Sequence, residues 1–265
     1  MIVYKSREEI EKIRQSNQIV ARILEELKTL IKPGVQTREL DDYAERRCRE
    51  LGVLPAFKGY RGFPASLCTS INEEIVHGIP SSRKLREGDI ISLDFGTNYR
   101  GFYGDAAVTY PVGDVSLRTK KLIETAEKAF YNGIEQMKEG QRISDISFAI
   151  QSYVESQGFS VIRTFVGHGI GFALHEEPQV PNFGIPGRGP KIKPGLVLAI
   201  EPMIAVGDWR IEVLADDWTA VTRDRSLSAH FEHTVALTED GLKILSLWDQ
   251  KKGLSYQKES SYAKA

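Results

Sequence analysis

The chain has 265 residues, with 35 basic and 36 acidic side chains and a formal net charge of -1. The absence of a strongly basic or acidic block excludes nucleic acid and anionic membranes as main partners. Cys48 and Cys68 are too few for a disulfide framework, and we find neither an apolar leader nor an apolar run long enough to span a bilayer. We therefore expect a cytoplasmic protein.

Apolar residues at helical spacing predict two helices near the start of the chain. The first opens with the capping-box pattern Ser6-Arg7-Glu8-Glu9. Thr37 is expected to cap the second helix, and Gly52 is expected to end it. Two further helices are predicted at about 116–137 and 144–157.

The remaining apolar segments predict strands. They lie at about 66–71, 90–95, 102–110, 159–166, 196–206, 228–237 and 242–245, with two shorter ones near 211 and 221. The order, a helix pair followed by strands and then the same again, predicts an α+β fold with helices covering an antiparallel sheet. Because no composition break is suited to a linker, we expect one domain over residues 1–249 and a polar tail over 250–265.

The segment Asp89–Val112 predicts a β-hairpin. If its turn is centred between Tyr99 and Arg100, Asp94 lies directly opposite Asp105. Side chains in such a pair are about 5 Å apart, and like charges at that distance repel each other. Since the neighbouring residues are apolar, the two carboxyl groups either share a proton or hold a cation.

Two further carboxylates, Glu201 and Glu232, lie in apolar segments where an unpaired charge costs several kcal/mol. Each alone has an ordinary explanation, such as a salt bridge or a sheet edge. Together with the hairpin pair and the glycine-flanked His168 they have a common one, because four carboxylates neutralise two divalent cations. Oxygen ligands with a single imidazole suit Mn²⁺, Fe²⁺, Co²⁺ or Zn²⁺, so Cys68 is expected in a pocket wall or core.

The motifs around these residues resemble those of the type I methionine aminopeptidases. They are Asn72–Pro80, Asp94 with Asp105, Gly167–Gly171, His175–Pro178, Glu201-Pro202 and Phe231–Thr234. The set, in this order and spacing, is highly specific and covers the chain to about residue 247. The resemblance implies the pita-bread fold, with a pseudo-twofold antiparallel sheet covered by two helix pairs. It also implies dinuclear-metal hydrolysis that removes the initiator methionine when the second residue is small.

Carried over position by position, the resemblance implies a full set of metal ligands. These are Asp94, Asp105, His168, Glu201 and Glu232. Asp105 and Glu232 would bridge two divalent ions, and Glu201 would also act as the base that takes a proton from the attacking water. His175 would help to stabilise the oxyanion, and His77 would contact the substrate near the scissile amide.

The same resemblance implies an apolar pocket for the methionine side chain. Its lining would be Tyr60, Phe63, Cys68 and Trp218, with His77 and His175 also contacting the substrate. Without the resemblance, an aromatic loop is better explained as core packing. Phe57 and Leu174 depart from the family pattern and change the shape of the pocket. Because Ile2 is bulky, the rule for the second residue predicts that this chain keeps Met1.

The implied partners are the N-termini of nascent polypeptides, acted on by a monomer, and association with the ribosome is left open.

An Xaa-Pro peptidase of the same fold would carry an extra N-terminal domain, for which the helix beginning at Ser6 leaves no room. A binding protein on this fold would lack metal ligands, whereas all five are present. An oxygen-activating iron enzyme would use two histidines and one carboxylate as ligands. The excess of carboxylates over histidines among the candidate ligands argues against that class. His230 and His233 are expected in supporting or structural roles.

Overall fold

The computed structural model describes residues 1–248, so the predicted tail over 250–265 lies outside the described residues. The helices are α1 (Arg7–Lys28), α2 (Thr37–Leu51), α3 (Leu117–Ile134) and α4 (Ile143–Ser156). The strands are β1 (Leu54–Pro55), β2 (Leu67–Ile71), β3 (Glu74–Val76), β4 (Ile90–Tyr99), β5 (Phe102–Pro111), β6 (Ser160–Val161), β7 (Gly167–Gly169), β8 (Glu176–Val180), β9 (Val197–Ile200), β10 (Met203–Ala205), β11 (Ile211–Val213), β12 (Ala220–Thr222), β13 (Ser228–His230), β14 (Glu232–Thr238) and β15 (Gly241–Ile244). No helix within residues 1–248 combines the length and apolar composition needed to cross a bilayer.

Local capping chemistry sets the helix ends. The Ser6 hydroxyl accepts a hydrogen bond from the Glu9 N–H (3.2 Å), and the Glu9 carboxylate accepts one from the Ser6 N–H (2.7 Å), so the predicted capping box is confirmed. The prediction that Thr37 caps α2 is wrong, because Gln36 is the capping residue and Thr37 begins the helix. The Thr37 hydroxyl instead bonds the backbone N–H and C=O of Ser81.

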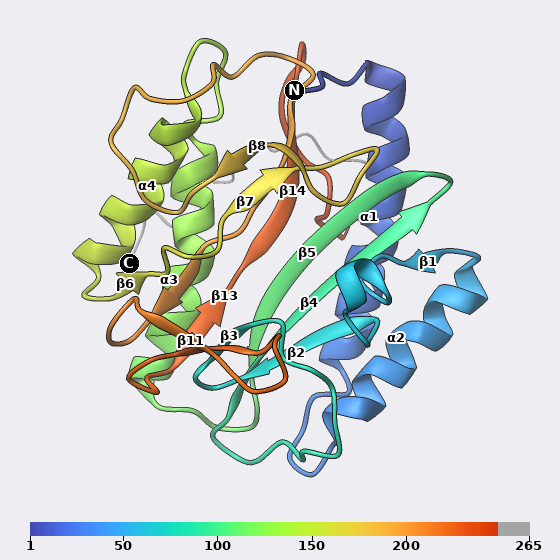
Figure 1. Ribbon diagram of the computed structural model, residues 1–265, viewed down its shortest axis with the longest axis vertical. Coiled ribbons are helices and arrows are strands. Elements are labelled where there is room, and N and C mark those ends of the chain that lie inside the picture. Colours follow the sequence, from blue (N-terminus) through green and yellow to red (C-terminus); the bar gives the residue numbers. More distant parts are fainter. Residues whose placement is uncertain (249–265) are drawn as a thin grey trace, which may run out of the picture.

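A large antiparallel sheet runs through the middle of the molecule. Its strand order is β1-β4-β5-β14-β9-β7-β8, with β2 paired to β4 and β15 paired to β14. Two small sheets, β13-β10-β6 and β11-β12-β3, complete the strands. Figure 1 shows α1 and α2 along one side and α3 and α4 along the other. This is the expected α+β arrangement, with one helix pair for each half of the chain.

The β4–β5 hairpin has a different register from the predicted one. Its turn residues are Arg100 (φ 55°) and Gly101 (φ 84°), and their positive φ values are typical of a two-residue type I′ turn. The hairpin midpoint therefore lies one residue further along the chain than predicted. Asp94 pairs with Ala107, so the prediction that Asp94 directly opposes Asp105 is wrong. Because Asp105 is two residues from Ala107, both carboxylates still point to the same face of the sheet.

The predicted long strands over 196–206 and 228–237 are each broken. β9 ends before Glu201-Pro202, and β10 then leaves the large sheet for the small one. In the same way β13 ends before Phe231, and β14 begins directly after it. The Phe231 N–H donates a hydrogen bond to the Pro202 C=O (3.1 Å), so the two interrupted segments are bonded to each other where their strands break. The predicted strand over 159–166 is reduced to Ser160–Val161.

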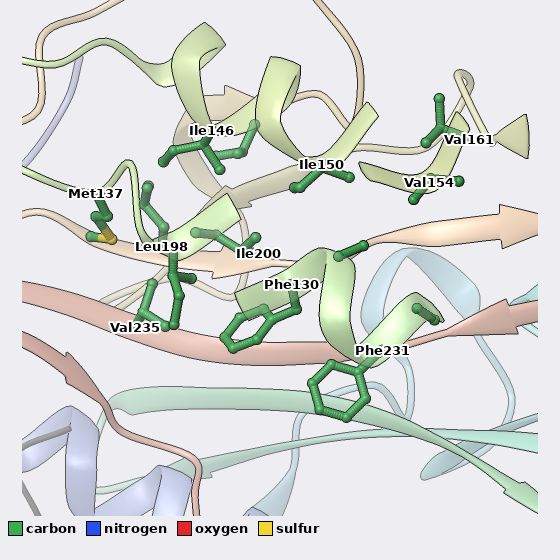
Figure 2. Close-up of a cluster of buried hydrophobic side chains, with 14 of the residues drawn as sticks. Phe130, Met137, Ile146, Ile150, Val154, Val161, Leu198, Ile200, Phe231 and Val235 are labelled. Carbon is green, nitrogen blue, oxygen red and sulfur yellow. The ribbon is translucent and has the colours of Figure 1, made fainter. Parts of the chain in front are cut away.

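The helices bury one face of the large sheet. Figure 2 shows Phe130 and Ile150, from α3 and α4, facing Leu198 and Val235 of the sheet. A second apolar core beneath α1 and α2 takes up Leu93 and other residues of the β4–β5 hairpin. Successive residues of a strand point to opposite faces. The residues adjacent to these core positions, such as Asp94 after Leu93, therefore face away from the helices.

Candidate active site

The five predicted metal ligands lie on, or directly after, five neighbouring strands of the sheet. Asp94 is on β4, Asp105 on β5, Glu232 at the start of β14, Glu201 directly after β9, and His168 on β7. In the sheet these strands follow one another as β4-β5-β14-β9-β7. All five side chains are buried, with exposed fractions between 2% for Glu232 and 9% for Asp94 and Glu201. Ligand atoms of Asp105, His168 and Glu232 lie within 4.8 Å of one another.

The carboxylates of this cluster have only histidines, and no lysine or arginine, as basic neighbours in the described part of the chain. Within residues 1–248, no lysine or arginine forms an ion pair with any of the four. Asp94 Oδ1, Asp105 Oδ1 and Glu232 Oε1 are buried without a hydrogen-bond partner among the same residues. Burial raises the pKa of all four carboxyl groups, and the neighbouring carboxylates raise it further for Asp105, Glu201 and Glu232. The cluster therefore needs protons or added cations.

The donor chemistry of the cluster fits divalent metal ions. His168 Nδ1 lies 3.0 Å from the Gly169 C=O, and its Nε2 lies 3.5 Å from Glu201 Oε1. Burial lowers the pKa of His168 to about 4, so its ring is neutral at pH 7 and Nε2 can act as a ligand. Four carboxylates and one neutral imidazole suit ions that prefer mixed oxygen and nitrogen ligation.

Several supporting residues were not predicted from the sequence. The Asn17 side chain, on α1, accepts a hydrogen bond from the Asp105 N–H (3.2 Å), and the Thr234 hydroxyl donates to the Asp105 C=O (2.8 Å). The Asn182 side chain donates to the Glu201 C=O (3.0 Å). Gly104 allows α1 to approach, since a Cβ there would lie 2.7 Å from the Asn17 nitrogen. These contacts join residues far apart in the chain, so no local pattern indicates them.

Two histidines flank the cluster. His77 follows β3 with φ 61°, and its ring lies edge-on to Trp218 with centroids 6.0 Å apart. Burial lowers the pKa of His77 to about 4, so it is neutral at pH 7. His175 stacks on Tyr60 (5.2 Å) with Nδ1 2.9 Å from the Tyr60 hydroxyl, and its ring centroid is 4.2 Å from that of His168.

The remaining two histidines lie behind the cluster. His233 Nδ1 is 2.8 Å from the Ser246 hydroxyl, which is a structural contact. His230 is buried, its Nε2 is 3.8 Å from Glu201 Oε2, and neither ring nitrogen has a hydrogen-bond partner within residues 1–248. The supporting or structural roles expected for them stay predictions.

A cavity of about 150 Å³ opens onto the cluster. Besides the five cluster residues it is lined by Phe57, Tyr60, Arg61, Phe63, Cys68, Val76, His77, Leu174, His175 and Trp218. The structure thus brings every predicted pocket residue to one cavity, including the two that depart from the family pattern. Burial raises the pKa of the Cys68 thiol well above its ordinary value, as expected for a wall residue. Arg61 and Val76 were missed, although both adjoin residues that were predicted.

Comparison with known proteins agrees with this geometry. The model of metallopeptidase family M24 matches residues 11–239, so the chain belongs to that family. Methionine aminopeptidase 1 of Bacillus subtilis is 53% identical over 246 residues, which is 93% of this chain and 99% of the relative. Methionine aminopeptidase of Clostridium acetobutylicum is 52% identical over 248 residues, which again cover 93% of this chain and 99% of the relative. Within the family the chain therefore groups with the methionine aminopeptidases, and it is a metalloaminopeptidase.

Solved structures support the same grouping. The crystal structure of methionine aminopeptidase from Thermotoga maritima has a TM-score of 0.91 and 48% identity, and covers 93% of this chain and 99% of its own. The fold is therefore the pita-bread fold of family M24. Prolidase from Pyrococcus furiosus has a TM-score of 0.76 at 22% identity, and the match covers 94% of this chain and 66% of the prolidase chain. At this identity the likeness shows a shared fold alone.

Proposed function

We propose that this enzyme removes the initiator methionine from nascent polypeptides whose second residue is small. The reaction would use two divalent ions, drawn from Mn²⁺, Fe²⁺, Co²⁺ and Zn²⁺. Their ligands would be Asp94, Asp105, His168, Glu201 and Glu232. The observation that carries this proposal is the cluster itself, in which no lysine or arginine within residues 1–248 pairs with the buried carboxylates. Such a cluster is stable in the ionised form only with bound cations.

The ions, when bound, supply Lewis-acid polarisation of the scissile carbonyl and lower the pKa of the attacking water. Glu201 takes the proton from that water and delivers it to the departing amine. It is placed for this role because it is buried in the cluster and lines the cavity that opens onto it.

His175 stabilises the negative charge that develops on the carbonyl oxygen. When the Tyr60 hydroxyl donates to Nδ1 (2.9 Å), the ring proton lies on Nε2, which can then donate to the substrate. His77, neutral and held edge-on to Trp218, contacts the substrate near the scissile amide.

The cavity supplies specificity for methionine. A thioether side chain is unbranched and polarisable, and it packs well against Tyr60, Phe63, Cys68 and Trp218. Phe57 and Leu174 adjust the shape of this pocket, so they set how strongly methionine is preferred over other apolar side chains.

The substrate defines the setting of the reaction. N-termini of nascent chains emerge in the cytoplasm, where we place residues 1–249 as a single catalytic domain acting as a monomer. Association with the ribosome would bring the enzyme close to this substrate. Co-sedimentation of the purified enzyme with ribosomes tests that element of the proposal.

Peptide cleavage tests the function. With added divalent metal, Met-Gly-Met should be hydrolysed to methionine and Gly-Met, whereas Met-Ile-Gly should be cut at least about tenfold more slowly. Metal analysis of the same sample should show activity rising with metal content. Cleavage of Ala-Pro but not of Met-Gly-Met would instead indicate an Xaa-Pro peptidase and overturn the proposal.

A further inference from the structure

A buried ion pair lies beside the catalytic histidine. Lys5, in the arm that precedes α1, pairs with Glu176, the residue directly after His175. The Lys5 side chain is 1% exposed and that of Glu176 is 11% exposed. Neither residue lines the cavity that opens onto the metal cluster. The two are 171 residues apart in the chain, so the pair joins the N-terminal arm to the start of β8, where the loop from β7 ends.

Glu176 holds that loop closed. Its Oε1 accepts hydrogen bonds from the Phe172 N–H (2.6 Å) and the Ala173 N–H (3.0 Å), while its Oε2 meets the Lys5 ammonium. The segment 171–175 is thereby tied into a compact turn from which the His175 side chain extends. The β5 strand provides a second tie, since the Tyr103 N–H donates to the Gly171 C=O (2.8 Å).

Lys5 is itself fixed in place. Its backbone N–H donates to the Gly195 C=O (2.7 Å), and its ammonium donates to the Val3 C=O (3.1 Å). Figure 1 shows the N-terminus at the same end of the molecule as β7 and β8. The arm therefore presents a fixed positive charge to Glu176. Without this charge Glu176 would be a largely buried, unpaired carboxylate that gains by turning toward water.

We infer that Lys5 is a positioning residue for the reaction, which fixes Glu176 and thereby the loop that carries His175. The inference rests on the oxyanion role proposed above for His175. A hydrogen-bond donor for a developing oxyanion must be held in place before the reaction, and a displacement of about 1 Å can cost on the order of 10²-fold in rate. Release of the Glu176 carboxylate would free two backbone N–H groups and let the His175 ring move.

A double-mutant cycle tests the inference. Lys5→Met keeps an unbranched, slightly shorter side chain and removes its charge, and Glu176→Gln keeps an oxygen that can accept from the two N–H groups. We expect Lys5→Met to lower kcat for Met-Gly-Met by roughly 10- to 100-fold with KM changed less than about threefold. Its Phe172 and Ala173 amides should exchange hydrogen faster, whereas metal content stays unchanged.

The double variant Lys5→Met/Glu176→Gln distinguishes the loss of charge pairing from a nonspecific loss of local structure. Because it leaves no unpaired charge, we expect kcat to return to within about threefold of wild type. Lys28→Met is the matched control, since Lys28 lies at the far end of α1 and pairs with Glu25 where both side chains are exposed. That variant should behave as wild type.

Two results would overturn the inference. One is a Lys5→Met enzyme with wild-type kcat and unchanged exchange at Phe172 and Ala173. The other is a double variant that folds but remains as slow as Lys5→Met. Hydrogen exchange does not depend on turnover, so it still decides whether Lys5 holds the loop if the wild type fails to cleave Met-Gly-Met. That failure would refute the proposed function instead.

Discussion

Glu176 and the central carboxylate cluster are both largely buried, and they differ in where the neutralising charge comes from. Glu176 has Lys5 as its cation, so the chain itself completes the pair. In the central cluster, Asp94, Asp105 and two glutamates have no lysine or arginine partner within residues 1–248. The first arrangement stabilises a loop, whereas the second leaves charge for ions from solution to balance. The two sites should therefore respond differently to mutation, to chelation and to pH.

Removal of a cluster carboxylate should have the largest effect. In Asp94→Ala we expect kcat for Met-Gly-Met to fall by on the order of 10²- to 10³-fold, because one metal ion loses a ligand and the charge balance changes. Metal analysis should show lower occupancy. Glu177→Gln, an exposed change next to Glu176, should keep wild-type activity and metal content. Undiminished activity of Asp94→Ala at full metal occupancy would refute the assigned ligand set.

Changes at His175 should lower activity without removing metal. We expect His175→Ala to lose on the order of 10²-fold in kcat, because an oxyanion donor is lost while the ligands remain. Tyr60→Phe removes only the hydroxyl that lies 2.9 Å from His175 Nδ1, and it should cost about 1 kcal/mol, or roughly fivefold. Steady-state kinetics with parallel metal analysis measures both. Loss of metal in His175→Ala would show instead that His175 helps to hold the metal ions, and would contradict the assigned role.

Chelation should make stability depend on pH. Burial lowers the pKa of His77 and His168 to about 4, so their contribution to stability grows with pH and is complete above about pH 6.5. The cluster carboxyl groups have raised pKa values, so the unfolded chain gives up protons that the folded apoprotein keeps. Above about pH 6.5 the metal-free protein should therefore lose stability as pH rises, by about 1.4 kcal/mol per pH unit for each proton retained.

Urea unfolding from pH 6.5 to 8, with and without a chelator, measures this difference. The metal-loaded protein should show little slope, because ions replace the protons on the carboxylates. Equal slopes for the two samples would mean that the cluster does not hold metal in the folded protein.

The smallest expected effect concerns the chain's own N-terminus. Met1 is fully exposed, whereas Ile2 is half-buried against the core beneath α3 and α4. Because Ile2 is bulky, intact-mass spectrometry of the protein produced in bacterial cytosol should show Met1 retained, and Ile2→Ala should lose it. Removal of Met1 from the wild type would contradict the rule for the second residue in this setting.

Local sequence patterns predicted much of this fold. Helical periodicity and the Ser6 capping box located the helices, and carboxylates in apolar strands indicated the cluster before any geometry was known. The hairpin register was wrong because it depends on which two residues take positive φ, here Arg100 and Gly101. The breaks at Glu201-Pro202 and Phe231 were missed because apolar composition alone does not show where a strand changes sheets.

Contacts over long sequence separation were beyond local patterns. The strand order that gathers the five cluster residues depends on how the two halves of the chain pair, through β5 and β14. The resemblance to a known family supplied that set in advance, residue by residue. It gave no indication of the Lys5–Glu176 pair or of Asn17 beneath Asp105, which only the packed structure brings together.

Metal titration of the apoprotein tests the central claim most directly. Isothermal calorimetry with Mn²⁺ in buffers of different ionisation enthalpy counts the bound ions and the protons released together. We predict two ions for each chain, with protons released because the carboxyl groups of the cluster ionise as the ions bind. A protein that cleaves Met-Gly-Met at full rate without bound ions, or that binds ions equally well after Asp105→Asn and Glu232→Gln, would contradict the account.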